Sequence, residues 1–568
     1  MPSRRQAVAV FVGALVAAGC SQKPPAPAPT ELESPLSFSG NGWTPAEWAE
    51  YYHLPEGSEL MPYSLLANLK SIKTGKPFLE DMERFGFLQD RASTANPYGM
   101  PVGLTVARSR DASSEGVEMV GFNCAACHVG EITWKGKRLR LHGAPGLINL
   151  QGYQVEFRDS LNDTLKNPKK LLALVIAMEK KQTPDTPSEE AASQYLNDEA
   201  VKTAGDVQPK PTADPDYASK PSKEADALRP EAAKLPFAQR LKLDIALLKA
   251  RLAYIEHGRL ILDGTEPGPG RVDAFGAARN FLFPKYAMKM QSPVSFPYIW
   301  SVPDNTREKW TAKSTGWIHY DGNTNSILER NIGQALGMGA VFDPKTYQSS
   351  LRIVNLHRLE ELTRQLKPPR WPEELLGPID AAKAEAGKKI FEEKCQGCHR
   401  DQLVSLVDVG TDPNRANSFG RPVDKTPFPA AVAPILKALK ERAFQDEGIS
   451  KEEQVGMDVN PAIWRATGKY MARTLWGIWA TAPYLHNASV PTLYHLLHPD
   501  QRPQKFLVGN REFDPEKVGY QTTASGPDVW EFDTSQPGNS NIGHAGERFG
   551  TTLPEEQKAA LLEYLKTL

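Results

Sequence analysis

The chain of 568 residues has few cysteines, almost no net charge, and no long apolar run after its first 20 residues. Its formal net charge of −1 gives no indication of a polyanionic partner, so we expect no binding to nucleic acid. Without an apolar run of transmembrane length, no later segment is expected to span a bilayer. The length allows two or more domains.

Four of the 5 cysteines belong to two copies of one pattern, C-x-x-C-H. The copies are formed by Cys124, Cys127 and His128, and by Cys395, Cys398 and His399. A zinc site would need four ligands close in space, and paired knuckles usually lie within about 20 residues of each other. These copies are in different halves of the chain. A redox dithiol would explain the cysteines but not a histidine directly after both pairs.

Covalent haem attachment explains every position of the pattern. Each cysteine forms a thioether bond to one porphyrin vinyl group, and the adjacent histidine becomes the proximal ligand of the iron. The two copies therefore predict two covalently attached haem c groups. Such attachment takes place outside the cytoplasm in bacteria, where spare cysteines would be expected to form disulfides. Only Cys20 remains once the two motifs are assigned.

The first 20 residues have the pattern of an export signal. Arg4 and Arg5 precede an apolar stretch from Ala7 to Ala18, and small residues lead to Cys20. This resembles a bacterial lipoprotein signal in which Cys20 is lipidated; the alternative is a plain secretory signal cut near Ala18. Both predict a mature chain outside the cytoplasm, periplasmic or attached to the outer membrane. Residues 21–40 are proline-rich and predict an extended tether.

Composition and periodicity predict a mainly α protein with two haem domains and long loops. The N-terminal haem domain is expected over 41–370 and the C-terminal one over 371–568. Residues 182–235 are rich in Pro, Ala, Lys, Glu and Asp, which predicts a largely disordered insertion in the first domain. A helix is expected over 236–258, where apolar residues recur at helical spacing.

The second motif is preceded by a predicted helix with Asp380 as its cap. Gly387 on this helix would let another helix cross closely. We expect that helix to be the last one of the chain, which is predicted to begin with a capping box of Thr552 and Glu555. A helix that ends at C-x-x-C-H and is crossed by the C-terminal helix resembles the c-type cytochrome fold, which suggests two cytochrome c-like domains.

Several further stretches resemble one protein family. They are "GPGRVDAFG", "SPVSFPYIWSVPD", "ILERNIGQALG", "WATAPYLHNASVPTLYHLL" and "REFDPEKVGY". With the motifs, they resemble the large branch of the bacterial di-haem cytochrome c peroxidase superfamily, which includes the rubber oxygenases. The resemblance implies that one haem has an open face for peroxide or dioxygen, while a six-coordinate haem relays electrons. It also implies that the N-terminal haem is the reactive one.

The same resemblance points to further residues at the two haems. His544 matches the position of a second axial histidine for the C-terminal haem, with His486 as the alternative. The family carries Trp-Asp-Gly-Arg between its haems, where this chain has Tyr320-Asp321-Gly322-Asn323. Tyr320 or Trp317 is therefore the candidate for the bridging aromatic residue, with Trp300 and Trp310 nearby.

The expected carboxylate on the open side of the N-terminal haem is missing from its place. The first carboxylate near that place is Asp343, and Glu329 and Gln334 are the nearest polar alternatives. This predicts an apolar pocket, which suits dioxygen better than peroxide cleavage. The basic stretch at 135–143 is expected either to pair with haem propionates or to form a solvated strand or loop face.

Together these features predict an exported di-haem c-type cytochrome that acts as an oxidoreductase. Peroxide or dioxygen would react at the N-terminal haem, and a protein or a small redox molecule would exchange electrons through the other. The alternatives are an electron-transfer cytochrome with both haems six-coordinate, and a haem-bearing scaffold whose insertion recruits a partner. The substrate stays open, because a lipid anchor fits poorly with an extracellular polymer such as rubber.

Overall fold

The structure is a computed structural model that describes residues 36–110, 116–179, 186–206, 234–258, 263–300, 317–399, 405–458, 462–523 and 529–568. Cys20 with the predicted signal, Trp310, and most of the predicted tether lie outside these residues. The tether was expected to continue to residue 40, but Leu36–Phe38 forms strand β1, which pairs with Lys137–His142, strand β6. The chain is therefore part of the folded body from Leu36 onward.

Two small sheets position the first motif. The sheet order is β1-β6-β5 in one and β2-β4-β3 in the other. The further strands are β2 (Met61–Pro62), β3 (Leu104–Arg108), β4 (Glu118–Phe122) and β5 (Val129–Trp134). The motif itself forms α3 (Ala125–His128), a single turn between β4 and β5. Gly103, at φ +83°, lies against this turn, and a Cβ there would collide with the backbone of Ala126.

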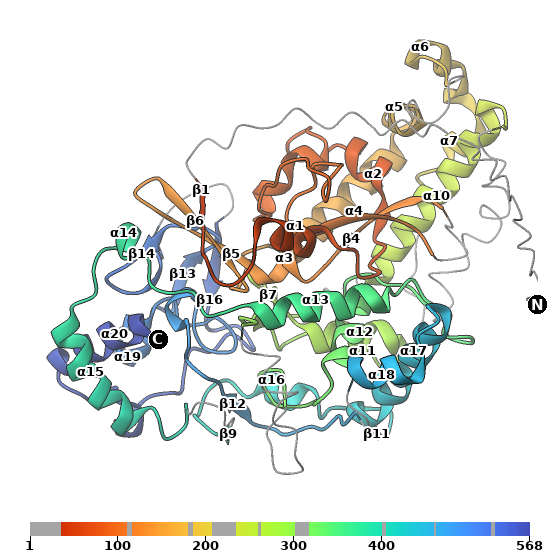
Figure 1. Cartoon of the computed structure of the whole chain (residues 1–568). Helices are drawn as coiled ribbons and strands as arrows, with labels where there is room; N and C mark the ends of the chain where they lie inside the picture. Colours follow the sequence, from red (N-terminus) through yellow and green to blue (C-terminus); the bar gives the residue numbers. More distant parts are fainter. Residues whose placement is uncertain are drawn as a thin grey trace, which may run out of the picture.

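Helices cover these sheets in the N-terminal part, coloured red to yellow-green in Figure 1. Their bounds are α1 (Pro45–His53), α2 (Tyr63–Asn68), η1 (Phe78–Phe85), α4 (Leu150–Lys166), α5 (Pro168–Glu179) and α10 (Phe237–Gly258). The helix predicted over 236–258 is confirmed by α10, whose Leu241, Leu248 and Leu252 are buried.

The predicted insertion is folded in its first part. It forms α6 (Glu189–Ala192), η2 (Ser193–Asn197) and α7 (Glu199–Lys202). Ala192 and Val201 join the apolar core of the N-terminal part, and a buried ion pair joins Glu179 to Arg240 on the two flanking helices. The expectation of disorder does not hold for 186–206, because small apolar residues pack there; 207–233 lies outside the described residues.

The middle of the chain shares its core with a later segment. The helices are α11 (Ala274–Leu282), α12 (Ile327–Gly337), α13 (Ile353–Gln365) and α17 (Phe428–Asp446). Leu328 and Leu356 pack in one apolar cluster with Phe428 and Leu436. The predicted boundary at 370/371 therefore does not separate two independent cores.

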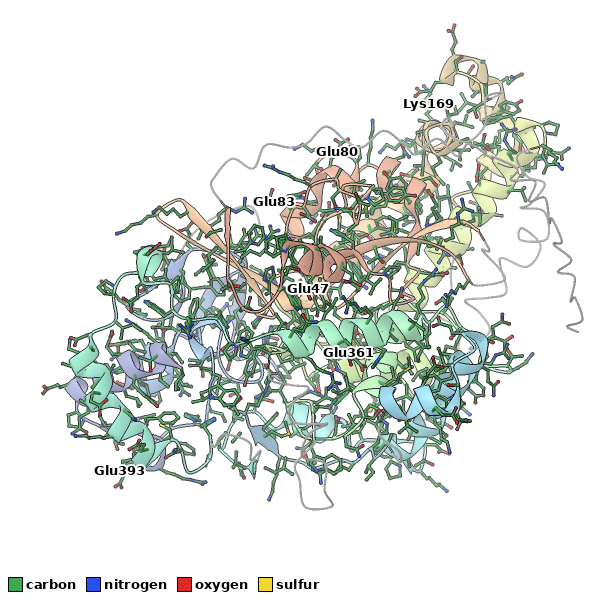
Figure 2. All side chains as sticks on the ribbon, in the orientation of Figure 1. Glu47, Glu80, Glu83, Lys169, Glu361 and Glu393 are labelled. Atoms are coloured by element: carbon green, nitrogen blue, oxygen red, sulfur yellow. The ribbon has the colours of Figure 1, made fainter. Side chains whose placement is uncertain are left out.

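In the C-terminal part, α15 (Ala381–Lys394) crosses α20 (Glu555–Thr567). The prediction for Gly387 is confirmed, because a Cβ there would collide with the carbonyl oxygen of Ala560. Asp380 caps α15 as predicted, and Glu393 points outward from the same helix (Figure 2). The capping box predicted for the last helix is wrong: Pro554 holds the cap position, and Glu555 instead accepts a hydrogen bond from His498.

The remaining elements are short. They are β7 (Arg271–Val272), η5 (Pro284–Tyr286), β8 (Val294–Ser295), α14 (Glu373–Leu376), β9 (Ser405–Val407), α16 (Asn414–Ser418), β10 (Pro422–Val423), β11 (Thr426–Pro427), α18 (Lys451–Met457), β12 (Tyr470–Ala472), η7 (Ile478–Ala480), α19 (Leu493–Leu497), η8 (Pro499–Gln501), β13 (Lys505–Val508), β14 (Phe513–Asp514), β15 (Gly519–Tyr520), β16 (Trp530–Asp533) and η9 (Glu547–Phe549). Among the described helices, none combines the length and the apolar character needed to cross a bilayer.

Candidate functional site

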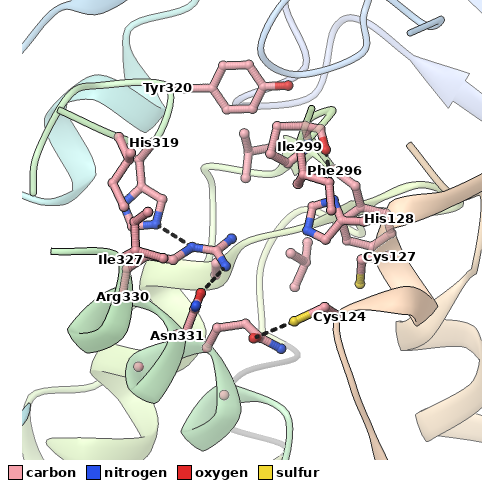
Figure 3. A pocket seen from close by; sticks show the side chains of 18 of the residues that line it. Cys124, Cys127, His128, Phe296, Ile299, His319, Tyr320, Ile327, Arg330 and Asn331 are labelled. Atoms are coloured by element: carbon pink, nitrogen blue, oxygen red, sulfur yellow. Dashed lines mark hydrogen bonds between the residues drawn. The ribbon is translucent and has the colours of Figure 1, made fainter. Parts of the chain in front are cut away.

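The first C-x-x-C-H motif lines a cavity of about 260 Å³. Cys124, Cys127 and His128 lie on one side of it (Figure 3). The Nδ1 atom of His128 lies 2.8 Å from the carbonyl oxygen of Pro297, to which it donates, so Nε2 is the nitrogen left for another partner. Burial lowers the pKa of His128 to about 3, which keeps the imidazole neutral, as a metal ligand must be.

The second motif repeats this arrangement at a cavity of about 240 Å³. Cys395 ends α15, and Cys398 and His399 line the same cavity. The Nδ1 atom of His399 lies 2.7 Å from the carbonyl oxygen of Arg473. Each motif therefore has its own cavity and a histidine oriented by one backbone carbonyl.

His544 faces His399 across the second cavity. Their ring centroids are 6.4 Å apart, and the ring planes differ by 50°. Two imidazoles bound to one iron would have centroids about 6.4 Å apart, if each bond is about 2 Å and each nitrogen lies about 1.2 Å from its ring centre. The Nδ1 atom of His544 is buried with no hydrogen-bond partner among the described residues, and burial lowers its pKa to about 4. The predicted pair thus has a separation suited to axial ligation.

His486, the alternative ligand, is engaged elsewhere in the structure. Its ring stacks on Tyr470 with centroids 4.1 Å apart, and its Nε2 atom lies 3.0 Å from the Tyr470 hydroxyl. The side chain lines the second cavity, but its ring makes no contact with His399 comparable to that of His544 among the described residues. The geometry therefore favours His544.

The cysteines suit thioether bonds better than free thiols or zinc. Burial raises the pKa of Cys127 to about 12 and that of Cys395 to about 11, and it raises the pKa of Cys124 well above its usual value. Thiols of this kind are poor nucleophiles, which argues against a redox dithiol. In the part of the chain that the structure describes, no three or more His, Cys, Asp or Glu side chains are grouped to hold a metal ion. A thiolate is costly to bury because it is charged, whereas a thioether is uncharged and can be buried without this cost.

The wall of the first cavity is mostly apolar, as the sequence predicts, but polar side chains also enter it. Arg330, Asn331 and Gln334 enter it from α12. The sequence did not indicate Arg330, because the family pattern places a carboxylate, not an arginine, on this side of the haem. Of the two carboxylates considered, Glu329 is bound by Lys440 at 2.7 Å, and neither it nor Asp343 lines the cavity.

Glu56 is a buried carboxyl group next to the first motif that the sequence did not reveal. Its Oε1 atom accepts a hydrogen bond of 2.9 Å from Gln334, and its Oε2 atom lies 3.4 Å from the Cys124 sulfur. Burial raises the pKa of Glu56 to about 7. It precedes the motif in a stretch without a recognisable pattern, so only the fold brings it there.

Tyr320 lines both cavities, whereas Trp317 lines only the first. The Tyr320 hydroxyl lies 2.8 Å from the hydroxyl of Ser295, and the ring of Trp317 lies under the guanidinium of Arg465, 3.3 Å from its centroid. The third candidate, Trp300, is fully buried and stacks on Tyr298. Tyr320 is therefore the candidate for the bridging aromatic residue that contacts both cavities.

Arg473 connects the surroundings of the two motif histidines. Its carbonyl accepts the hydrogen bond from His399, and its guanidinium donates 2.8 Å to the carbonyl of Tyr298. Tyr298 directly follows Pro297, whose carbonyl holds His128. Arg473 therefore orients His399 directly and also contacts the backbone next to the carbonyl that orients His128.

Arg415, another arginine that lines the first cavity, could bind a negatively charged group there. Arg415 is 4% exposed, and its Nε and Nη1 atoms are buried without a hydrogen-bond partner among the described residues. A haem propionate would supply the missing acceptors. Propionate pairing was one of two expectations for the basic stretch at 135–143, whose Arg138 and Arg140 lie in β6 and pair with Glu131 at 2.8 and 3.1 Å. For these two residues the propionate expectation is wrong.

Comparison with known proteins gives one matching family model and two relatives of unknown function. A family model described as RoxA-like, cytochrome c-like matches residues 468–507, which include part of the wall of the second cavity. Uncharacterized protein y4iJ of Sinorhizobium fredii (strain NBRC 101917 / NGR234) is 28% identical over 625 residues, covering 95% of this chain and 93% of that protein. Uncharacterized protein y4iM of the same strain is 29% identical over 340 residues, covering 54% and 74%. The match identifies a cytochrome c-like segment, which implies haem c and an oxidoreductase kind of role.

Proposed function

We propose that the chain is an exported di-haem c-type cytochrome that acts as an oxidoreductase. In this proposal the N-terminal haem reacts with peroxide or dioxygen, and the C-terminal haem relays electrons. The single observation that carries it is the difference between the two cavities. His399 is faced by His544 at a separation that suits a closed axial pair, whereas Arg330 lies on the side of the first cavity that faces His128 (Figure 3).

The residues fit two haem c groups. Cys124 and Cys127 would hold the first through thioether bonds, and Cys395 and Cys398 the second. His128 and His399 would be the proximal ligands, and His544 the second ligand of the C-terminal haem. A bound haem would supply an iron that gains and loses one electron. The cytochrome c-like match at 468–507 supports this cofactor, although it includes neither motif.

The protein's own contribution differs between the two sites. At the C-terminal site, two histidines would leave no axial position for a substrate, so that site can only pass electrons. At the N-terminal site, His128 would occupy one face, and the cavity on the α12 side would admit a small molecule. Tyr320 and Arg473 lie at both cavities, so we propose that electrons pass between the sites through this region.

Spectroscopy of the purified full-length protein tests the proposal. The ferric protein is expected to give one high-spin and one low-spin electron paramagnetic resonance signal. Addition of peroxide, carbon monoxide or oxygen in the appropriate oxidation state is expected to change only the high-spin component. Intact mass should show two haem additions. Fewer than two additions would contradict the cofactor assignment itself.

The second candidate function is an electron-transfer cytochrome with two closed haems. The observation in its favour is that His319 lines the same cavity as His128. A shift of Arg330 would be needed before His319 could reach the place of a second ligand, because Arg330 lies between the two rings (Figure 3). Two low-spin signals and no response to small ligands would support this function instead.

The remaining proposals concern architecture and location. We propose that α15, the second motif and α20 form a cytochrome c-like domain, supported by the close crossing at Gly387. A second such domain would hold the first motif. Lipidation at Cys20 would attach the protein to a membrane on the periplasmic side, where a redox protein or small redox molecule is its partner. Metabolic labelling with a fatty acid, compared between wild type and Cys20→Ser, tests the anchor.

A further inference from the structure

We infer that Arg330 is the binding group for a small hydrogen-bond-accepting oxidant, such as hydrogen peroxide, and that His319 is the residue that positions it. The inference rests on the proposed function, because it requires a haem on the His128 side of the first cavity. It goes further by naming the substrate class and the side chain that recognises it. It also reverses the expectation of a pocket suited mainly to dioxygen.

Arg330 projects from α12 into the first cavity. Its guanidinium lies between His319 and His128 and is directed toward His128 (Figure 3). The Nε atom donates 3.2 Å to Nε2 of His319, and Nη1 donates 2.8 Å to the side-chain oxygen of Asn331. Within the described residues, Nη2 has no hydrogen-bond partner. The group therefore has free donors directed into the cavity.

His319 holds this arginine because its own protonation is fixed. Its Nδ1 atom lies 2.6 Å from Oδ1 of Asn323. The amide nitrogen of Asn323 donates to both carboxylate oxygens of Asp321 at 3.1 Å, so Oδ1 is the atom that faces the histidine. Nδ1 of His319 must then carry the proton, and Nε2 is an acceptor for Arg330.

The contacts that hold His319 come from the Tyr320-Asp321-Gly322-Asn323 stretch, a role that the sequence did not reveal. Asp321 is fully buried and pairs with Arg415 at 3.5 Å. His319 has φ +68°, a left-handed conformation that is rare for a residue with a side chain and is often kept at functional sites. Asp321 and Asn323 thus orient His319, and His319 orients Arg330.

The chemistry of the cavity gives the class of ligand. Besides the polar residues of α12, the lining of this cavity includes apolar side chains such as Ile327, Phe275 and Val432. A guanidinium in such surroundings forms stronger hydrogen bonds than in water, and its planar donors select ligands with lone pairs or negative charge. Hydrogen peroxide and small monoanions meet this requirement. Neutral dioxygen, a weak acceptor, gains less.

Fluoride is the probe for this inference, because it is a small anion that binds an open ferric haem and accepts strong hydrogen bonds. The experiment measures fluoride dissociation constants optically with the full-length protein carrying both haems. Arg330→Leu is expected to weaken fluoride binding about 10- to 100-fold, since a charge-assisted hydrogen bond is lost. Arg330→Lys keeps the positive charge but lacks the paired N–H donors of the guanidinium, so it should lose less fluoride affinity than Arg330→Leu.

His319 is tested as a positioning residue by two substitutions. His319→Leu removes the acceptor for Arg330 and is expected to weaken fluoride binding several-fold at unchanged haem content. His319→Gln offers another acceptor and is expected to recover most of the affinity, which a merely space-filling role would not predict. Arg442→Leu on α17 is the matched control and should leave fluoride affinity unchanged, because Arg442 pairs with Asp446 and does not line the first cavity. Peroxide binding rates should follow the same order.

The outcomes separate the two levels of the proposal. Fluoride affinity within twofold of wild type in Arg330→Leu, at unchanged haem content and spin state, would overturn the role of Arg330. If Arg330→Leu does not retain haem, unchanged affinity in both Arg330→Lys and His319→Leu has the same meaning. A wild-type protein with two haems and no response to fluoride would overturn the open N-terminal site, and with it this inference.

Discussion

The ring of His544 lies opposite the ring of His399, with the two centroids 6.4 Å apart. His544 is brought there by a loop before the last helix, and its backbone N–H donates 2.7 Å to the carbonyl of Val409. Arg502 donates 2.6 and 2.8 Å to carbonyls of Asn541 and Gly543 just before it. The loop is therefore fixed by backbone contacts that place an imidazole on the open side of the second cavity.

This relationship predicts that His544→Ala converts the C-terminal haem from low spin to high spin. In the proposed assignment this variant would leave His399 as the one protein ligand of that haem, so a second high-spin signal should appear in the ferric protein. His486→Ala is the matched control, because His486 lines the same cavity but is bound to Tyr470. A low-spin signal that disappears in His486→Ala and persists in His544→Ala would reverse the assignment.

Gly387→Ala is expected to destabilise the protein by about 2 kcal/mol or more, because its Cβ would collide with the backbone of Ala560. Backbone cannot yield as a flexible side chain does, so α15 and α20 would have to separate. The free energy of unfolding in urea measures this. Gly456→Ala is the control: it lies in α18 with no atom within 4 Å of the added Cβ, and alanine favours a helix. Equal stability of the two variants would contradict the close crossing.

His142 predicts a loss of stability in acid. Burial lowers its pKa to about 3, whereas the unfolded chain titrates near 6.5. Below pH 6.5 the unfolded state takes up a proton that the folded state refuses, so this contribution is complete above 6.5 and is lost as pH falls toward 3.

His142→Gln should therefore flatten the fall in unfolding free energy between pH 6 and 4 by up to about 1.4 kcal/mol per pH unit. Tyr52→Phe is the control, because it removes the hydroxyl that contacts Nε2 of His142 at 2.8 Å but keeps the titrating ring. A slope in His142→Gln equal to that of wild type would assign the acid sensitivity to other groups.

Arg473→Gln is expected to lower the reduction potentials of both haems by tens of millivolts. A nearby cation favours the reduced state, and Arg473 lines both cavities, so its removal should act on both. Spectroelectrochemical titration measures the two potentials. Arg442→Gln serves as the control, because Arg442 lines neither cavity and pairs with Asp446 on its own helix. A shift at one haem alone would show that Arg473 does not couple the two sites.

Local patterns in the sequence predicted the elements that depend on neighbours along the chain. The helix over 236–258 and the cap at Asp380 follow from spacing and from a side chain close to its own backbone. The capping box at Thr552 and Glu555 failed because Glu555 found a partner in His498, from another part of the fold. The short strands around the first motif were missed, since both faces of β4 are buried and give little alternation.

The sequence by itself determined where each motif histidine stands next to its cysteines, because that pattern is a property of five consecutive residues. It also offered His544 and Tyr320, through resemblance, but could not choose between them and their alternatives. Only the tertiary structure decided that His544 faces His399, that Arg330 faces His128, that Glu56 lies beside Cys124, and that Arg415 reaches the first cavity. These groups come from segments far apart in the chain, and their meeting depends on helix crossings and loop anchors that no local pattern records.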